Sequence, residues 1–512
     1  MKSFVQFLGS NPGIKNIVLT LGVDSEIDTV WEICRNLQLD TLSVYVPTDE
    51  QKKDVLSAFG VFAHEACELI PKEFKVSLVS EIREYRRNEG LTALVFVQPS
   101  SHESVNMLDF IRPDFLVGEV DAKELNAYLI WEAYRKTASH IYIVSVHAND
   151  REEALDWQKR EDSDIELSII FPMYNIAAYL PKCIQSVTAW KADYVEYLFV
   201  DDGSPDNCAQ IVEEYAEKDF RIKLLQKKNG GCASARQYGL ERATGRYVAF
   251  IDPDDYIDES MHRKLLSRAL VGSYEISYCG YKELYEATGT VQEIDDVLGE
   301  PYCSGTADPK AIDELIAYRR IAIWRGIYLR ELIDRNGIHF YEDLRRFDDL
   351  PFKVETFACA KSVVAIPEYL YYYRMARPGQ DVAADDERLY VHFTIFDYLD
   401  KFLSRCRRTE QLDFLQIVKV QTHQWALEKM KPEFITEYCK LARKDIAMNH
   451  SFRNGLYVVN KYGSKKNTLY YVAIYHQWVW LVKRLIAYHR KADRKKEAAI
   501  EQLDLLSKKQ FK

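Results

Sequence analysis

The stretch LLQKKNGGCASARQYGLERATGRYVAFIDPDDYID (224–258) decides the fold at the centre of this chain. A short apolar run leads through NGG (229–231) into a helical pattern, which stops at Gly245 before the apolar run YVAFI. That run predicts a buried strand, and it ends directly in DPDD (252–255). Strands that alternate with helices predict a largely parallel α/β sheet, in which ligands bind at the carboxyl ends of the strands.

Carboxylates follow two of the predicted strands. Asp252 and Asp254 lie two residues apart on a turn stiffened by proline, and such hard oxygen donors suit Mg²⁺ or Mn²⁺ shared with substrate phosphates. The strand before the stretch, EYLFVDDGSPDN (196–207), ends in Asp201 and Asp202. Each motif also has a simpler explanation, because acidic residues are common in turns. The Gly-Gly start of the intervening helix favours a ligand site, since helix N-termini attract phosphate.

Residues 166–258 resemble the core of the family 2 glycosyltransferases, which are inverting enzymes of the glycosyltransferase-A fold that build bacterial surface glycans. The resemblance rests on SIIFPMYN (168–175), FVDDGSPDN (199–207) and the run from NGG to DPDD (229–255), in this order and spacing. It implies that Asp252 and Asp254 form the DxD motif for ribose and a divalent metal, either Mn²⁺ or Mg²⁺. It further implies a nucleotide-sugar site made of Pro172, Tyr174, Asn175, Asp202, Lys228, Gly230, Gly231, Arg236, Asp252, Tyr373 and Arg374.

The resemblance also implies a catalytic base in an acidic pair that is separated by two residues from a following aromatic residue. The segment FDDLPF (347–352) supplies Asp348 and Asp349, with Asp349 as the base, although the family usually has Glu first. Displacement with inversion needs a group that deprotonates the acceptor hydroxyl. Asp349 is alternatively a helix N-cap, and both roles are compatible. The pair Glu342-Asp343 competes, but no aromatic residue follows it at this offset.

Weaker matches concern the acceptor and the loop over the donor. Trp324 and Arg325 resemble the family's Trp-containing acceptor segment, although a core Trp is an equal alternative. YLYYYRMARPGQ (369–380) resembles the strand before the donor loop, with Gln380 where the family often has Ser. Gln237 replaces the usual Asn after Arg236, and no histidine in 360–385 offers a third metal ligand.

The domain organisation predicted is an N-terminal α/β domain of unknown role (1–160), a catalytic domain (161–385) and a helical region (386–512). The first part alternates apolar runs with helical patterns such as 28–37, which predicts a Rossmann-like parallel sheet without the GxGxxG dinucleotide motif. The charged segment 147–164 is interpreted as a linker or an exposed helix. The strands are expected at 17–22, 41–47, 75–79, 93–98, 115–120 and 140–146.

Composition limits the class of protein. Hydrophobic residues make up 47% of the chain, which excludes a disordered one. The 68 basic and 78 acidic residues give a net charge of −10, which argues against a nucleic-acid binder. The ten cysteines form no CxxC pair and indicate free thiols of a cytoplasmic protein. No signal peptide or membrane span is expected.

The C-terminal stretch 469–496 is rich in aromatic residues and then basic. Such a helix can lie on an anionic membrane, which predicts weak peripheral contact at the inner face of the cell membrane. A helix packed on the catalytic domain with a solvated basic tail explains the pattern equally well.

Taken together, the sequence predicts a metal-dependent inverting glycosyltransferase of the hexosyl- or N-acetylhexosaminyl-transferase class. Its donor would be a nucleotide-diphospho-sugar, with UDP as the expected nucleotide, and its acceptor a glycan or lipid-linked glycan such as lipopolysaccharide or capsule. Two alternatives stay open: a nucleotidyltransferase acting on sugar phosphates, and a non-catalytic glycan-binding or scaffold protein with a degenerate site.

Overall fold

A computed structural model gives the structure of this chain. It describes residues 152–491 except 287, 295–297, 318–321, 376–383 and 407–408, and before them residues 7, 10–11, 14–21, 41–45, 75–79, 91–97, 114–121, 128, 131–132, 135–136 and 138–146. The chain divides into two compact units, Met1–Asp164 with Ser267–Tyr274, and Ile165–Leu266 with Glu275–Lys512. The helices after residue 386 belong to the same unit as the central sheet. The predicted domain boundaries at residues 160 and 385 remain predictions.

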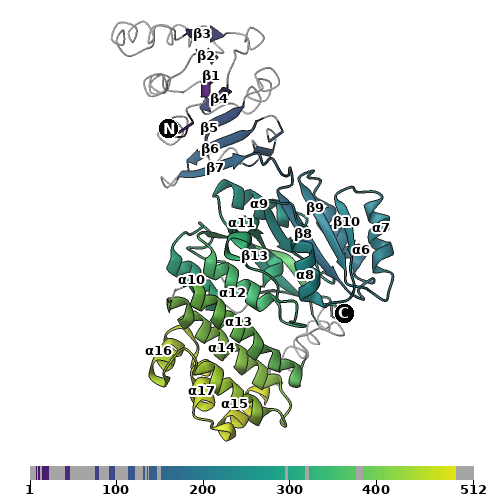
Figure 1. Ribbon diagram of the computed structural model, residues 1–512, viewed down its shortest axis with the longest axis vertical. Helices are drawn as coiled ribbons and strands as arrows, with labels where there is room; N and C mark the ends of the chain where they lie inside the picture. Colours follow the sequence, from purple (N-terminus) through teal and green to yellow (C-terminus); the bar gives the residue numbers. More distant parts are fainter. Residues whose placement is uncertain are drawn as a thin grey trace, which may run out of the picture. The chain divides into compact units, whose positions relative to one another are not determined.

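The N-terminal unit contains a seven-stranded sheet in its described part. Its strands follow the order β3-β2-β1-β4-β5-β6-β7 (Figure 1), and all pairs but the last are parallel. The first six are β1 (Ile14–Leu21), β2 (Thr41–Tyr45), β3 (Lys75–Val79), β4 (Leu91–Val97), β5 (Phe115–Asp121) and β6 (His140–Val146). Their order is that of a Rossmann sheet. The predicted helix 28–37 lies outside the described residues, so a complete Rossmann-like domain stays a prediction.

The interpretation of segment 147–164 as a linker or an exposed helix is wrong over part of its length. Glu152–Gln158 forms strand β7, which pairs antiparallel with β6. Leu155 and Trp157 are buried, whereas Asp156 and Gln158 between and after them are exposed. This alternation with a period of two is the pattern of an edge strand with one face on a core, and the high charge of the segment obscured it.

The second unit is built on a nine-stranded mixed sheet in the described residues. Its order is β10-β9-β8-β11-β15-β13-β16-β12, with β14 (Thr290–Ile294) added on β13. The half formed by β8 (Leu167–Met173), β9 (Val195–Asp201), β10 (Ile222–Gln226) and β11 (Tyr247–Phe250) is parallel. The other half contains β12 (Tyr256–Ile257), β13 (Ile276–Tyr285), β15 (Gly326–Leu329) and β16 (Val363–Arg374). The predicted strands before Asp201 and Asp252 are thus confirmed as neighbours of β8.

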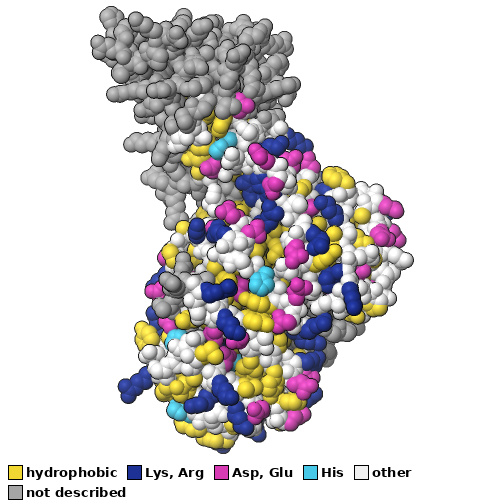
Figure 2. Space-filling model, in the orientation of Figure 1, with side chains coloured by type: hydrophobic (Ala, Val, Ile, Leu, Met, Phe, Trp, Pro, Cys, Tyr) yellow, Lys and Arg dark blue, Asp and Glu magenta, His cyan; other side chains and the backbone are white. Residues whose placement is uncertain are grey.

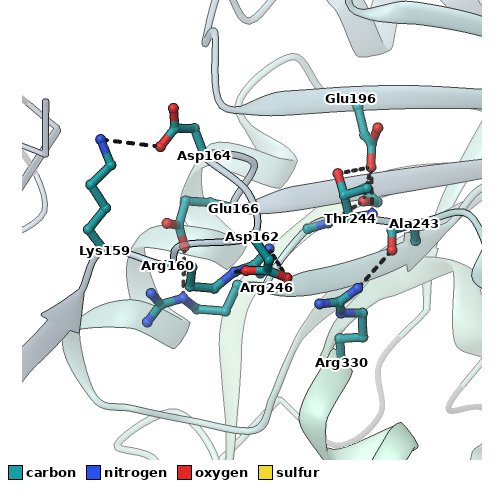
Figure 3. Close-up of polar contacts among 12 residues, drawn as sticks. Lys159, Arg160, Asp162, Asp164, Glu166, Glu196, Ala243, Thr244, Arg246 and Arg330 are labelled. Atoms are coloured by element: carbon teal, nitrogen blue, oxygen red, sulfur yellow. Dashed lines mark hydrogen bonds and ion pairs between the residues drawn. The ribbon is translucent and has the colours of Figure 1, made fainter.

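A buried carboxylate ties the parallel strands together at their amino ends. Glu196 accepts hydrogen bonds from Ser168 Oγ at 2.5 Å and from the backbone N–H of Thr244 at 2.8 Å (Figure 3). Gly245 lies so close to β8 that a Cβ atom would fall 2.5 Å from the backbone nitrogen of Ser168. The Thr-Gly pair before YVAFI therefore allows β11 to enter the sheet beside β8.

The helices of the second unit serve two cores. Around the sheet lie α6 (Leu180–Thr188), α7 (Cys208–Ala216), α8 (Cys232–Leu240), α9 (Met261–Val271), α10 (Pro309–Ala317), α11 (Arg330–Asn336) and α12 (Asp349–Cys359). The bundle after them has α13 (Val391–Cys406), α14 (Thr409–Lys429), α15 (Ile435–Ile446), α16 (Phe452–Tyr462) and α17 (Lys465–Tyr475). The α12, α13 and α14 helices pack in sequence (Figure 1), which joins the bundle to the sheet. Among the described residues, no helix has the length and apolar character of a membrane span.

The bundle encloses a network of charged and polar side chains, here called the bundle cluster and defined by Asp400, Lys419, His423, Tyr438 and Asp445. Lys419 Nζ lies 2.6 Å from Asp400 Oδ2 and 2.8 Å from Asp445 Oδ1. His423 contacts the other oxygen of Asp445 at 2.7 Å through Nε2 and the Tyr438 hydroxyl at 3.0 Å through Nδ1. Lys419 and His423 are almost completely buried, so their polar atoms need these partners.

Candidate active site

A cavity of about 660 Å³ opens at the carboxyl ends of β8, β9 and β11. Its walls come from the ends of these strands, the first turns of α8 and α12, the 3₁₀ turn Ile323–Arg325 and strand β16. This is the place where an α/β sheet binds its ligands. The predicted site residues that line it are Pro172, Tyr174, Asn175, Asp202, Gly231, Arg236, Asp252, Asp254, Trp324, Asp348, Asp349 and Tyr373.

Asp202 holds the glycine loop in place. Its two carboxylate oxygens accept hydrogen bonds from the backbone N–H groups of Gly230 and Gly231, at 2.9 and 2.7 Å. Lys227 Nζ adds a third contact at 2.8 Å. Gly231 adopts φ of 94°, a backbone conformation that residues other than glycine rarely adopt. A carboxylate at the end of β9 thus determines where helix α8 begins.

Arg236 lies between two acidic elements of the site. Its Nη1 atom donates to Asp348 Oδ2 at 2.7 Å, and its Nη2 atom donates to Asp252 Oδ1 at 2.6 Å. The side chain is buried and packs near the ring of Phe340. The next residue, Gln237, accepts a hydrogen bond from the Phe340 backbone at 3.0 Å. Arg236 therefore connects the DxD turn to the start of α12, in addition to bordering the cavity.

The DPDD turn is braced from the neighbouring strand. Asp255 accepts hydrogen bonds from the Tyr371 hydroxyl and the Arg374 backbone N–H, both at 2.7 Å. Arg374 Nε also donates to the carbonyl of Asp254 at 2.7 Å. Burial, together with the charges of Asp254 and Asp252, raises the pKa of Asp255 well above its usual value. The turn thus concentrates negative charge at the cavity.

Asp349 is the first residue of α12, and Asp348 occupies the N-cap position without a side-chain cap hydrogen bond. Burial raises the pKa of Asp349 to about 6, and the charge of Asp348 adds to this, whereas Arg236 opposes it. Phe347, just before the pair, adopts the left-handed conformation with φ of 57°, which strains its backbone. A carboxylate in a cavity with a pKa near neutrality is suited to accept a proton.

The two cavity carboxylates of the DxD turn fit a divalent cation. Asp252 and Asp254 offer hard oxygen donors, and the crowded negative charge that raises the pKa of Asp255 would be relieved by a cation. Within the described residues, no group of three or more Asp, Glu, His or Cys side chains forms a metal cage. Two protein ligands agree with a cation that takes its remaining ligands from substrate phosphates and water.

Aromatic side chains form one wall of the cavity. Trp324 lines it while packing against Tyr371 and Tyr373, with ring centroids 4.1 and 5.4 Å away. Trp324 is thus a core residue that also lines the cavity, and its stacking on an acceptor sugar stays a prediction. Arg325 is different: it is completely buried and lies near the rings of Tyr278 and Tyr281.

Some predicted residues do not reach the cavity. Lys228 is exposed, and its neighbour Lys227 makes the contact to Asp202. Gly230, Arg325 and Arg374 act behind the cavity wall, and Gln380 lies outside the described residues. The competing acidic pair is engaged elsewhere, since Glu342 accepts from Ser234 and Asp343 from Tyr398, at 2.6 and 2.5 Å. Asp255 and Lys227 were missed, although Asp255 stands in the DPDD motif itself.

Comparison with known proteins agrees with this geometry. Residues 168–318 match the sequence profile of Glycosyl transferase family 2. This match places one segment of the chain, and not its whole length, with glycosyl transferase family 2. The family 2 segment contains β8, β9, the α8 loop and the DxD turn. Asp348, Asp349 and Tyr373, which complete the cavity, follow it in sequence.

Two curated relatives each match a part of this chain. It is 35% identical over 212 residues to "Uncharacterized glycosyltransferase EpsJ" of Bacillus subtilis (strain 168), which is 41% of this chain and 60% of EpsJ. It is 39% identical over 105 residues to "Minor teichoic acid biosynthesis protein GgaB" of the same organism, which is 20% of this chain and 12% of GgaB. The chain thus spans less than two thirds of either relative.

A solved structure shares its fold with part of this chain. It is described as "Crystal structure of S. aureus TarS 1-349 in complex with UDP-GlcNAc" and gives a TM-score of 0.51 at 19% identity. The match covers 64% of this chain and 92% of the TarS chain. The predicted glycosyltransferase-A fold, with a helical region after it, is confirmed by this likeness.

Proposed function

We propose that this chain transfers a sugar, with inversion, from a UDP-sugar to a glycan or lipid-linked glycan of the bacterial surface. The observation that carries the proposal is a single cavity lined by a carboxylate with a raised pKa, Asp349, and by the DxD carboxylates Asp252 and Asp254. The names of EpsJ and GgaB support glycosyl transfer for surface glycans, and the UDP-GlcNAc bound to TarS supports a UDP-linked donor.

Each group in the cavity has a part in this reaction. The loop held by Asp202 positions the start of α8, and the N-terminal end of a helix favours a diphosphate. Asp349 accepts the proton of the attacking acceptor hydroxyl, and its pKa of about 6 keeps it ionised at neutral pH. Asp252 and Asp254 would hold Mn²⁺ or Mg²⁺, which offsets the charge that grows on the leaving diphosphate. Trp324 and Tyr373 supply an aromatic wall for a sugar ring.

A thermal-shift screen tests the donor and the metal together. Purified chain is melted with UDP-, GDP- and dTDP-sugars, each with and without Mn²⁺. We expect a UDP-sugar to raise the melting temperature only when Mn²⁺ is present, because a ligand of the folded state stabilises it by mass action. An equal shift without the metal, or a larger one with a GDP-sugar, would contradict the corresponding part of the proposal.

The products separate this proposal from its alternatives. Glycosyl transfer releases UDP, whereas a nucleotidyltransferase releases pyrophosphate from a nucleoside triphosphate. A glycan-binding scaffold with a degenerate site releases neither. The presence of Asp202, Asp252, Asp254 and Asp349 in one cavity favours an active enzyme over the scaffold.

A further inference from the structure

The end of the chain has an unusual distribution of charge. Between Asp445 and Asp493 there is no Asp or Glu, whereas the same stretch contains eight Lys and Arg residues. Residues 446–492 thus carry a formal charge of +8 in a chain whose net charge is −10. A stretch with this positive charge attracts anionic partners. Its charge is opposite to that of the rest of the chain.

The same stretch exposes large hydrophobic side chains. In the part of the chain that the structure describes, nine such side chains are exposed, and six of them fall in 446–492. They are Met448, Tyr457, Leu469, Trp478, Trp480 and Tyr488. On the face drawn in Figure 2, hydrophobic and basic side chains lie next to one another over the C-terminal helices. Exposed Trp and Tyr beside Lys and Arg are typical of surfaces that contact a bilayer interface.

The helix 479–491 shows how both properties are arranged. Its inner face packs on the bundle: Val482 and Ile486 are buried in the core, and Arg490 donates to the carbonyls of Glu428 and Met430 at the end of α14. Its outer face has helical spacing and consists of Trp480, Lys483, Arg484, Ala487, Tyr488 and Lys491, all exposed. From the sequence alone, a packed helix and a basic aromatic surface are alternatives. In the structure they are two faces of one helix.

We propose that this outer face, together with Trp478, docks the enzyme on an anionic lipid bilayer. The rings enter the interface between headgroups and acyl chains, and Lys483, Arg484 and Lys491 contact lipid phosphates. A soluble polyanion would bind the charges but would leave Trp480 and Tyr488 in water, so the aromatic residues favour the bilayer. Docking through this face is independent of the transfer chemistry, because none of its residues lines the cavity.

Vesicle flotation tests the proposal with the full chain. Vesicles of phosphatidylcholine alone are compared with vesicles that also contain about one third of the anionic lipid phosphatidylglycerol. We expect binding to the anionic vesicles only, with a loss as salt rises. Because each basic residue near such a surface contributes roughly a fivefold gain in binding, the triple variant Lys483→Glu/Arg484→Glu/Lys491→Glu should lose about a hundredfold or more.

Two matched controls separate this surface from general effects. Phe220 is exposed on another part of the same unit, so Phe220→Ala is the control for the double variant Trp480→Ala/Tyr488→Ala, which should lose binding. The exposed residues Lys218, Lys310 and Lys361 provide a control charge reversal. Equal flotation of the triple variant and its control would overturn the proposal, as would binding of the wild type to heparin but not to vesicles. Unchanged melting temperatures verify that each variant is folded.

Discussion

Two buried clusters of charged residues in this chain have the same plan and different surroundings. In the active site, Arg236 bridges Asp348 and Asp252, and in the bundle cluster, Lys419 bridges Asp400 and Asp445. The first cluster lines the cavity and has an additional carboxylate, Asp349, whose pKa is raised to about 6. In the second cluster, burial would raise the pKa of Asp445, but hydrogen bonds from His423 and Lys419 hold it below its usual value.

The difference shows how to distinguish a reactive site from a structural one. A buried cation between two carboxylates is found in both places. By itself, this arrangement therefore does not identify a catalytic site. What distinguishes the active site is a third carboxylate beside the bridging cation, Asp349, which lines a cavity. The bundle cluster distributes its hydrogen bonds so that Asp445 is fully engaged, which favours one packing of α13, α14 and α15.

The largest effect is expected from Asp349→Asn. This change removes the proton acceptor and keeps the shape, so the transfer rate should fall by about a thousandfold, within the usual range for a general base. Binding of UDP-sugar, followed by calorimetry, should persist because Asp349 does not belong to the loop or the DxD turn. A rate within tenfold of the wild type would contradict its assignment as the base.

The bundle cluster should respond in stability and not in catalysis. Lys419→Met leaves Asp400 and Asp445 buried without their cation, which should lower the free energy of unfolding by about 3–5 kcal/mol. Urea unfolding measures this loss, and the transfer rate per folded molecule should not change. Lys401→Met is the matched control, because Lys401 pairs with Asp397 on the surface and should contribute less than about 1 kcal/mol.

Arg236 should combine the two responses. Arg236→Lys keeps the charge but cannot donate to Asp348 and Asp252 as a planar fork, so we expect about a tenfold to hundredfold loss of rate. Arg236→Gln removes the charge that lowers the pKa of Asp349 and should also move the midpoint of the pH–rate profile upward. If both variants retained the wild-type midpoint, Arg236 would not control the base.

The smallest effect concerns pH in the unchanged enzyme. Because Asp349 must be ionised to act and its pKa is about 6, kcat/KM should fall about tenfold for each pH unit below 6 and level off above it. Initial rates between pH 4.5 and 8, an interval that brackets this value, provide the measurement. A profile that is flat through pH 6 would show that another group accepts the proton.

Much of the catalytic sheet could be predicted because its strands are continuous apolar runs that end in polar motifs. FVDDG and YVAFIDPDD predicted both the strands and the cavity edge, and β8, β9 and β11 confirm the strands as parallel neighbours. Strand β7 was not predicted, because its alternating pattern lies within a charged segment. The alternation of apolar and polar residues around Leu155 and Trp157 is present in the sequence. The many charged residues of the segment are the more prominent feature, and they favoured a linker or an exposed helix.

The partners of side chains were harder to predict than their positions. The sequence places Arg236 near the site, but the contact to Asp348 joins residues that are 112 positions apart. Lys227 and Lys228 are adjacent, and only the end of the strand decides which of them turns toward Asp202. Arg325 was expected at the acceptor, yet its place in the 3₁₀ turn before β15 directs it into the core.

The hydrogen bonds of Asp202 have a thermodynamic consequence for the donor. The loop at Gly230 and Gly231 is already ordered by this carboxylate, so its conformational entropy is lost during folding and not when the nucleotide arrives. Donor affinity should then report contacts rather than loop ordering. The heat capacity change of binding should accordingly be small, as expected for a ligand that enters a preformed pocket.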